Sequence, residues 1–212
     1  MDTSKKAIIQ IHLEKCKEAL EANGMKVFIA DDKTQAQQYV NELIQDHTLV
    51  CDGGTRTLAE TGIIDLLKKR DIIYRTHNDA SMTREESDEE ARKAFSADTF
   101  LCSSNAITLD GSLINVDGHG NRVSAMIFGP KQVIVVAGYN KIVADEDAAK
   151  ERIRTIAAPM NSVRLQKKTP CRTLGKCMNC HSKDRICCSY VKMNYDREDR
   201  IRVILIAEEY GY

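Results

Sequence analysis

The chain has 212 residues, enough for one sizeable α/β core and too few for two full catalytic domains. Its 31 basic and 31 acidic residues give a formal net charge of zero, so bulk charge attracts it neither to nucleic acid nor to an anionic membrane. Charges interrupt the apolar positions of the N-terminal segment, and no stretch approaches the roughly 20 apolar residues that span a bilayer. We expect one cytoplasmic domain over residues 1–212, with no nucleic-acid partner and no membrane span.

Apolar stripes at helical spacing alternate along the chain with short apolar runs that are typical of buried strands. In chain order the sequence predicts a helix at 7–20, a strand at 25–30, a helix at 34–45, a strand at 48–51, a helix at 58–69 broken near Gly62, a strand starting at 72–74, a helix at 83–95, a strand at 99–102, a hairpin within 106–116, a strand at 132–137, a helix at 145–157 and a last strand at 201–207. Strands separated by helices predict an α/β fold with a mainly parallel sheet and helices on both faces.

Local signals refine three of these elements. Thr83 and Glu86 have the spacing of a capping box, which opens a charged and mostly solvated helix. Asp110-Gly111 between apolar neighbours predicts the turn of an antiparallel hairpin. Pro159 is expected to stop the helix at 145–157.

Five of the eight cysteines fall in a short segment, and we expect residues 170–190 to form a metal or cluster loop inserted before the last strand. Only Cys177 and Cys180 form a C-x2-C pair, which favours a [4Fe–4S] cluster over the paired knuckles of a zinc site. A cluster needs four thiolates, so one of Cys187 and Cys188 is spare. Zinc, with His181 as an alternative ligand, and unliganded thiols remain alternatives.

Two further groups of residues are candidates for ligand binding. Gly53, Gly54 and Thr55 form a strand-to-helix turn, where free backbone N–H groups make an anion site, although such turns also occur without a ligand. Polar residues also follow later strands, where side chains converge at the end of a parallel sheet. They are Asn105, Asn121, Arg122, Asn140 and Lys141. His77 and His119 are more often loop histidines than catalysts, so no catalytic residue is assigned.

Several stretches resemble the LUD (lactate utilisation) domain family. SSNAITLDGSLINVDGHGNRVSAMIFGPKQVIVVAGYNKIV resembles its central block, CDGGTRTLAETGI its Gly-rich block, and CRTLGKCMNCHSKDRIC the single-domain subgroup with a C-terminal cysteine motif. The resemblance implies a fold similar to the NagB/RpiA/CoA-transferase superfamily and a place in lactate oxidation beside iron–sulfur partner proteins. Glu60 fits the Gly-rich block, yet no glutamate maps onto a CoA-transferase nucleophile.

The first hypothesis is an accessory or electron-transfer component of lactate (2-hydroxy acid) utilisation. In this hypothesis Cys171, Cys177, Cys180 and Cys187 hold a [4Fe–4S] cluster, and the two groups of candidate residues bind a small anionic metabolite. Arg122 and Lys141 would neutralise a carboxylate or phosphate, and the glycine turn would donate N–H groups. The alternatives are a non-redox metabolite-binding or regulatory protein with structural zinc, and a stand-alone enzyme acting on a sugar phosphate or acyl-CoA. The metabolite and the number of chains in the assembly are left open.

Overall fold

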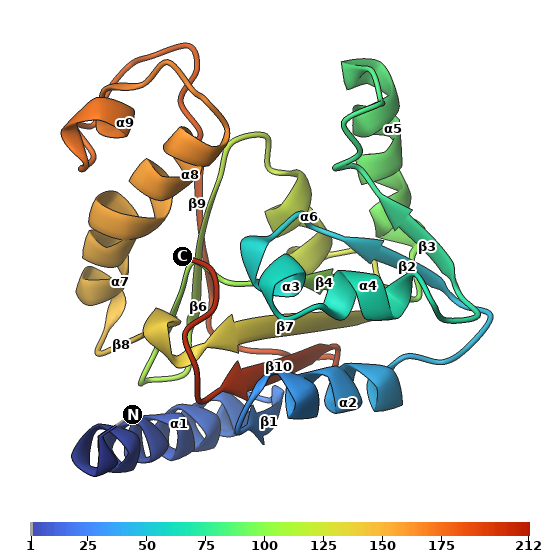
Figure 1. Ribbon diagram of the computed structural model, residues 1–212, viewed down its shortest axis with the longest axis vertical. Coiled ribbons are helices and arrows are strands. Elements are labelled where there is room, and N and C mark those ends of the chain that lie inside the picture. Colours follow the sequence, from blue (N-terminus) through green and yellow to red (C-terminus); the bar gives the residue numbers. More distant parts are fainter. Residues whose placement is uncertain (1) are drawn as a thin grey trace.

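A six-stranded parallel sheet organises the chain in the computed structural model, which describes residues 2–212 (Figure 1). Its strands are β1 (Lys26–Ala30), β2 (Leu49–Asp52), β3 (Ile73–Thr76), β4 (Thr99–Cys102), β7 (Gln132–Gly138) and β10 (Ile201–Ile206). They lie in the order β1-β10-β7-β4-β2-β3, and every neighbouring pair is parallel. The predicted α/β fold with a mainly parallel sheet is confirmed.

Helices cover both faces of this sheet because its central strands are apolar on both sides. Along β7, Val133 and Val135 pack with α1 (Thr3–Ala22) and α6 (Asn121–Ile127), while Ile134 and Val136 pack with the helices of the opposite face. The helices of that face are α2 (Lys33–Leu43), α3 (Arg56–Glu60) and α4 (Ile63–Leu67). The break expected near Gly62 separates α3 from α4, and Gly62 has a positive φ of 72°.

The predicted hairpin belongs to a second, four-stranded sheet. Its strands are β5 (Ala106–Thr108), β6 (Leu113–Asp117), β8 (Ile142–Val143) and β9 (Ser189–Met193), in the order β8-β5-β6-β9. Only the β5–β8 pair is parallel. Gly111 turns the hairpin with φ 84°, and an added Cβ there would lie 2.5 Å from the carbonyl oxygen of Ala19, so the turn docks closely on α1. The hairpin prediction is confirmed.

The prediction that Pro159 stops a helix is wrong. Helical backbone runs from α7 (Glu146–Arg152) through a π-helical turn (Ile153–Ala157) into α8 (Ala158–Arg164). Proline lacks an N–H and its ring conflicts with the carbonyl four residues earlier, and a widened π turn relieves that conflict. Pro159 therefore sits in the first turn of α8, and the α7–α8 column covers the second sheet through Ala149, Ile153 and Ala158.

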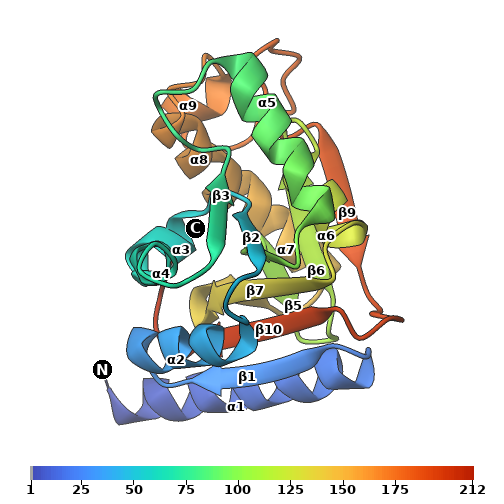
Figure 2. The same cartoon turned by 90° about the vertical axis from the view of Figure 1, so that its right-hand side faces the viewer.

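The remaining elements are short helices and turns. α5 (Arg84–Lys93) has the predicted capping box, buries none of its residues and continues into a 3-10 turn (Ala94–Ser96). A second 3-10 turn (Tyr139–Lys141) follows β7, and α9 (Pro170–Leu174) precedes the cysteine segment. α9 lies at the end of α8 that is far from the parallel sheet (Figure 2). None of the helices within residues 2–212 has the length and hydropathy to cross a membrane.

Candidate functional site

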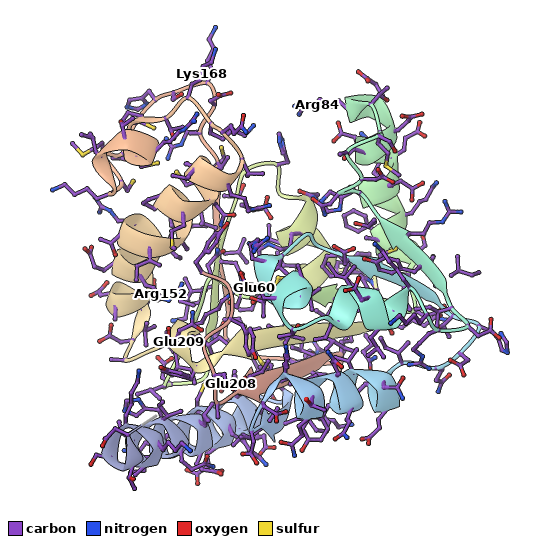
Figure 3. All side chains as sticks on the ribbon, viewed as in Figure 1. Glu60, Arg84, Arg152, Lys168, Glu208 and Glu209 are labelled. Carbon is purple, nitrogen blue, oxygen red and sulfur yellow. The ribbon has the colours of Figure 1, made fainter. Side chains whose placement is uncertain are left out.

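A cavity of about 360 Å³ opens above the carboxyl ends of β2, β4 and β7. α5 and the α7–α8 column rise on opposite sides of it, with Arg84 near the free end of α5 and Lys168 just beyond α8 (Figures 1 and 3). The carboxyl ends of parallel strands are where α/β folds place their ligands, since the loops that follow the strands converge there. This cavity is therefore the candidate ligand site.

Seven of the eight residues predicted to bind a ligand line this cavity. They are Gly53, Gly54, Thr55, Asn105, Asn121, Arg122 and Lys141. The eighth, Asn140, does not line it. Its side-chain amide donates to the carbonyl oxygen of Gly211 at 3.0 Å and accepts from the N–H of Tyr210 at 3.2 Å. Asn140 therefore fastens the C-terminal segment, a role that only the folded chain reveals.

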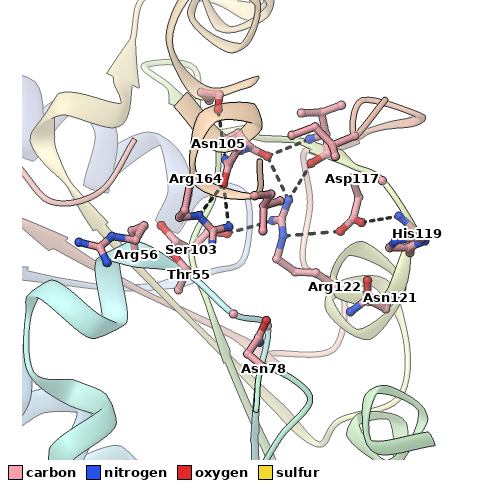
Figure 4. Close-up of a pocket in the computed structure, with 18 of the residues that line it drawn as sticks. Thr55, Arg56, Asn78, Ser103, Asn105, Asp117, His119, Asn121, Arg122 and Arg164 are labelled. Atoms are coloured by element: carbon pink, nitrogen blue, oxygen red, sulfur yellow. Dashed lines mark hydrogen bonds and ion pairs between the residues drawn. The ribbon is translucent and has the colours of Figure 1, made fainter. Parts of the chain in front are cut away.

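Arg122 is the centre of a hydrogen-bond network in the wall of the cavity (Figure 4). Its two terminal nitrogens donate to the side-chain oxygens of Asn105 and Asn115 at 3.0 and 2.6 Å. The same nitrogens donate to the carbonyl oxygens of Ser103 and Val116, both at 3.0 Å. Nε lies 3.6 Å from a carboxylate oxygen of Asp117. We predicted that the Arg122 guanidinium neutralises a ligand, but in the structure it is hydrogen-bonded to acceptors of the protein. These bonds hold β4, β5 and β6 in position relative to one another.

The glycine turn also uses its N–H groups within the protein. The N–H of Gly53 donates to the carbonyl oxygen of Leu101 at 2.8 Å, and that of Gly54 to Asp52 Oδ1 at 2.7 Å. The second oxygen of Asp52 accepts from the Tyr74 hydroxyl at 2.6 Å. An added Cβ at Gly53 would lie 2.9 Å from side-chain carbons of Arg122 and Phe100. Glycine is needed at position 53 because Arg122 and Phe100 pack closely against it, and its N–H is not free for a ligand.

Lys141 is the most unusual charged group in the cavity wall. It follows β7 in a 3-10 turn, is 2% exposed, and donates from Nζ to Thr57 Oγ1 and Ser103 Oγ, both at 2.9 Å. Burial lowers its pKa to about 7, with further lowering from Arg152 and Arg122. Thr57, Ser103 and Lys141 itself follow β2, β4 and β7, so the sheet topology brings the three residues together.

Two features of the site were missed by sequence reasoning. Arg152 is 6% exposed and donates to the carbonyl oxygens of Asn140 and Asn105 at 2.9 and 2.5 Å, and burial lowers its pKa to about 10. The cavity wall also carries basic residues from separate elements, and only their common location identifies them as a group. This basic rim consists of Arg56, Arg84, Arg164 and Lys167.

The two histidines lie at the mouth of the cavity. His77 Nε2 is 3.2 Å from the side-chain nitrogen of Asn121 and 3.3 Å from that of Asn78. His119 also lines the cavity, in an Asx turn closed by Asp117. Glu60 lies outside the lining, pairs with Arg56 at 3.2 Å and accepts from the N–H of Gly211 at 2.7 Å. Neither contact gives Glu60 access to a ligand.

The four cysteines predicted as metal ligands line one small pocket of about 10 Å³. They are Cys171, Cys177, Cys180 and Cys187. Cys188 is exposed and donates to the carbonyl oxygen of Arg185 at 3.5 Å, so the structure places Cys187 with the other three. His181 is exposed and does not line the pocket. Within residues 2–212 no three His, Cys, Asp or Glu side chains are arranged closely enough to hold a metal in this conformation.

The cysteine pocket and the ligand cavity share a wall. Ala158 of α8 and Ile186, just before Cys187, line both of them. Cys16, Cys51 and Cys102 are buried thiols outside the cysteine pocket, and burial raises their pKa to about 12, 11 and 12. Burial also raises the pKa of Cys187 in the cysteine pocket.

The class of protein follows from these features: an α/β fold with a polar cavity at the carboxyl ends of parallel strands. The model of the LUD domain family matches residues 13–206, so the chain belongs to the LUD domain family. This confirms the family resemblance and supports a role related to lactate utilisation in general terms.

The chain was also compared with solved structures, and one of them shows a shared fold. A DUF162 family protein from Deinococcus radiodurans is 13% identical, with a TM-score of 0.53 over 95% of this chain and 98% of that one, which shows a shared fold. Ribose 5-phosphate isomerase from Plasmodium falciparum is 16% identical, with a TM-score of 0.34 over 53% of this chain and 52% of its own. No curated protein matches the chain.

Proposed function

We propose that this LUD-domain chain binds a small carboxylate metabolite of lactate utilisation in the cavity, next to a metal centre held by the cysteine pocket. The observation that carries the proposal is the convergence of basic side chains from α3, α5, α8 and the segment after α8 on one cavity. Among the described residues, the lining contains only two side-chain carboxylates, Asp88 and Asp117, and both lie beside arginines. An anion in this cavity meets excess positive charge.

The four thiols fit a metal centre in number and chemistry. Thiolates are the ligands of both iron–sulfur clusters and structural zinc. Arg185 lies beside them, donating to Cys187 Sγ at 3.7 Å and to the carbonyl oxygen of Cys180 at 2.9 Å, and it would offset thiolate charge. When bound, a [4Fe–4S] cluster would supply one-electron transfer, and zinc would supply structure.

The two metals differ in how they fit. The cysteine spacing favours the cluster, whereas the pocket volume of about 10 Å³ is nearer to the size of a single ion, which the thiols would still have to draw together to hold. A cluster of four irons and four sulfides requires the loop between α9 and β9 to move outward. If the pocket holds a cluster, the chain would act as an accessory electron-transfer component with iron–sulfur partner proteins. If it holds zinc, the chain would act as a metabolite-binding regulatory protein.

Metal analysis after anaerobic purification and reconstitution separates these two functions. Iron and sulfide at a four-to-four ratio with visible absorbance support the cluster, and one zinc without iron supports the alternative. Cys187→Ser should abolish metal retention, and Cys188→Ser is the matched control that should keep it. Loss of metal in both variants, or in neither, contradicts the assignment of Cys187.

Calorimetric titration with lactate, pyruvate and lactamide tests the metabolite site. The two carboxylates should bind and the neutral amide should bind at least roughly tenfold more weakly, because the rim recognises negative charge. Arg164→Glu at the rim should weaken carboxylate binding, whereas Arg172→Glu, outside the cavity lining, should not. Equal binding of lactamide and lactate, or no binding of either carboxylate, overturns the proposed metabolite.

A further inference from the structure

Lys141 is a buried amine whose hydrogen-bond partners are hydroxyl groups. Within residues 2–212 no carboxylate lies within ion-pair distance of Nζ, and its partners are Thr57 Oγ1 and Ser103 Oγ. A buried ammonium without a carboxylate partner is costly, and an apolar side chain of similar volume would be cheaper in a purely structural role. Such a lysine calls for a chemical explanation.

The surroundings of Lys141 favour its neutral amine form. The charged and titratable groups that face it are Arg152 of α7, Arg122 of α6, Glu60 of α3 and Cys102 of β4. Burial and the two arginines outweigh Glu60, so a substantial share of the side chain is an unprotonated amine at neutral pH. A neutral lysine amine is a nucleophile toward carbonyl carbon.

Lys141 is part of the wall of the ligand cavity, although only 2% of the residue is exposed. It lines the cavity at the end of β7, while the basic rim lies on the elements around the cavity. A small 2-oxo acid has a carboxylate for the rim and an adjacent ketone for the amine. The two hydroxyls beside Nζ are donors as well as acceptors, so they can pass a proton to an oxygen that leaves the ketone carbon.

We propose that Lys141 Nζ forms a reversible imine with the ketone carbon of a small 2-oxo acid bound in this cavity. The nitrogen adds to the carbonyl carbon, and its first proton passes to the ketone oxygen to give the carbinolamine hydroxyl. The second proton of the nitrogen lets that hydroxyl leave as water. A C=N double bond replaces the C=O double bond, and no electrons are exchanged with another molecule. The imine withdraws electrons from the neighbouring carbon. This inference rests on the proposed metabolite site and adds a covalent step to it.

The geometry around Lys141 also assigns a positioning role to Thr57. Its hydroxyl holds Nζ at 2.9 Å and contacts the carbonyl oxygen of Tyr210 at 3.4 Å, in the C-terminal segment that passes over the amine. An added Cβ at Gly211 would lie 2.5 Å from Thr57 Oγ1 and 3.4 Å from Lys141 Nζ. Thr57→Val keeps the shape of the side chain and removes the hydroxyl.

Borohydride trapping tests the proposal directly. Wild-type protein incubated with pyruvate and sodium borohydride should acquire one reduced adduct, which peptide mapping places on Lys141. Lys141→Arg should give no adduct, and Lys69→Met, which removes an exposed lysine, should react as wild type. Lactate has no ketone and should give none. Adduct that persists in Lys141→Arg, or that spreads over many lysines, overturns the proposal.

Two further measurements separate chemistry from binding and folding. The initial rate of trapping should rise between about pH 6 and about pH 8 as the amine loses its proton. Thr57→Val should slow trapping roughly tenfold or more while calorimetry shows pyruvate binding retained. Pyruvate binding without any adduct refutes the imine and leaves the metabolite site intact. Absence of pyruvate binding removes both.

Discussion

Replacing Arg122 by methionine tests whether this side chain holds the site together or binds the ligand. The side chain of Arg122 is 13% exposed, and that of its carboxylate partner Asp117 is 10% exposed. Its terminal nitrogens make four hydrogen bonds of 2.6–3.0 Å, to two side-chain amide oxygens and two backbone carbonyl oxygens. Methionine fills a similar volume and makes none of them.

The size of the effect follows from those four contacts. A hydrogen bond to a charged group contributes about 1.5–3 kcal/mol, and a buried polar group left without a partner costs about 1–3 kcal/mol. The full sum overestimates the loss, because water from the adjoining cavity can reach some of the acceptors. We expect Arg122→Met to lower the free energy of unfolding by about 3–5 kcal/mol, as for other broken buried ion pairs.

Urea unfolding followed by far-ultraviolet circular dichroism measures this change, since the chain contains no tryptophan. Arg92→Met on the exposed face of α5 is the matched control and should change stability by less than about 0.5 kcal/mol. Asp117→Asn should be destabilising, and its effect should be smaller in the Arg122→Met background. If Arg122→Met resembles the control in stability but loses carboxylate binding, the guanidinium is a ligand group and the structural reasoning is refuted.

Three further predictions concern pH, a turn and the C-terminal segment. Lys141 binds its proton less tightly in the folded chain than in the unfolded one. The free energy of unfolding of wild type, minus that of Lys141→Met, should therefore rise from pH 7 toward pH 10.5 and stay constant below pH 7. A difference that does not change with pH contradicts the lowered pKa. Gly111→Ala, which meets the backbone of Ala19, should cost at least about 2 kcal/mol more in urea unfolding than Gly175→Ala, which has positive φ but no close neighbour; equal losses contradict close docking of the hairpin. Asn140→Ala should speed hydrogen exchange at Gly211 and its neighbours, and unchanged exchange would mean that the side chain does not fasten this segment.

Strand and helix positions were predictable where local periodicity matched final burial. The stripe in α1 buries Ile9, Leu13, Cys16 and Leu20, as its spacing indicates, and β7 is apolar because both of its faces are covered. α6 and β9 were not predicted from the sequence because their hydrophobic patterns are weak. α6 is a two-turn helix after Gly120, and β9 is an edge strand with no fully buried residue.

Most of the predicted residues that line the candidate site could be identified from the sequence, but the role of each residue could not. Strand ends can be located from sequence, and residues after parallel strands converge, so the lining was recognised. Roles depend on contacts between residues far apart in sequence. Arg122 reaches Ser103, Arg152 reaches Asn105, and Asn140 reaches Gly211. No local pattern states which polar group faces the ligand and which one faces the protein.

The wall shared by the two pockets predicts that metal and metabolite affect each other. Ile186 lines both pockets, and its neighbour Cys187 is a proposed metal ligand, so fixing the thiol also fixes part of the cavity wall. Coupling between linked sites is typically about 5–150-fold in affinity and acts equally in both directions. Pyruvate affinity should therefore differ between metal-loaded and metal-free protein, and Ile186→Ala should reduce that difference. Met178→Ala, which changes only the cysteine pocket, should keep it. Identical affinities with and without metal would show that the two pockets, although adjacent, work independently.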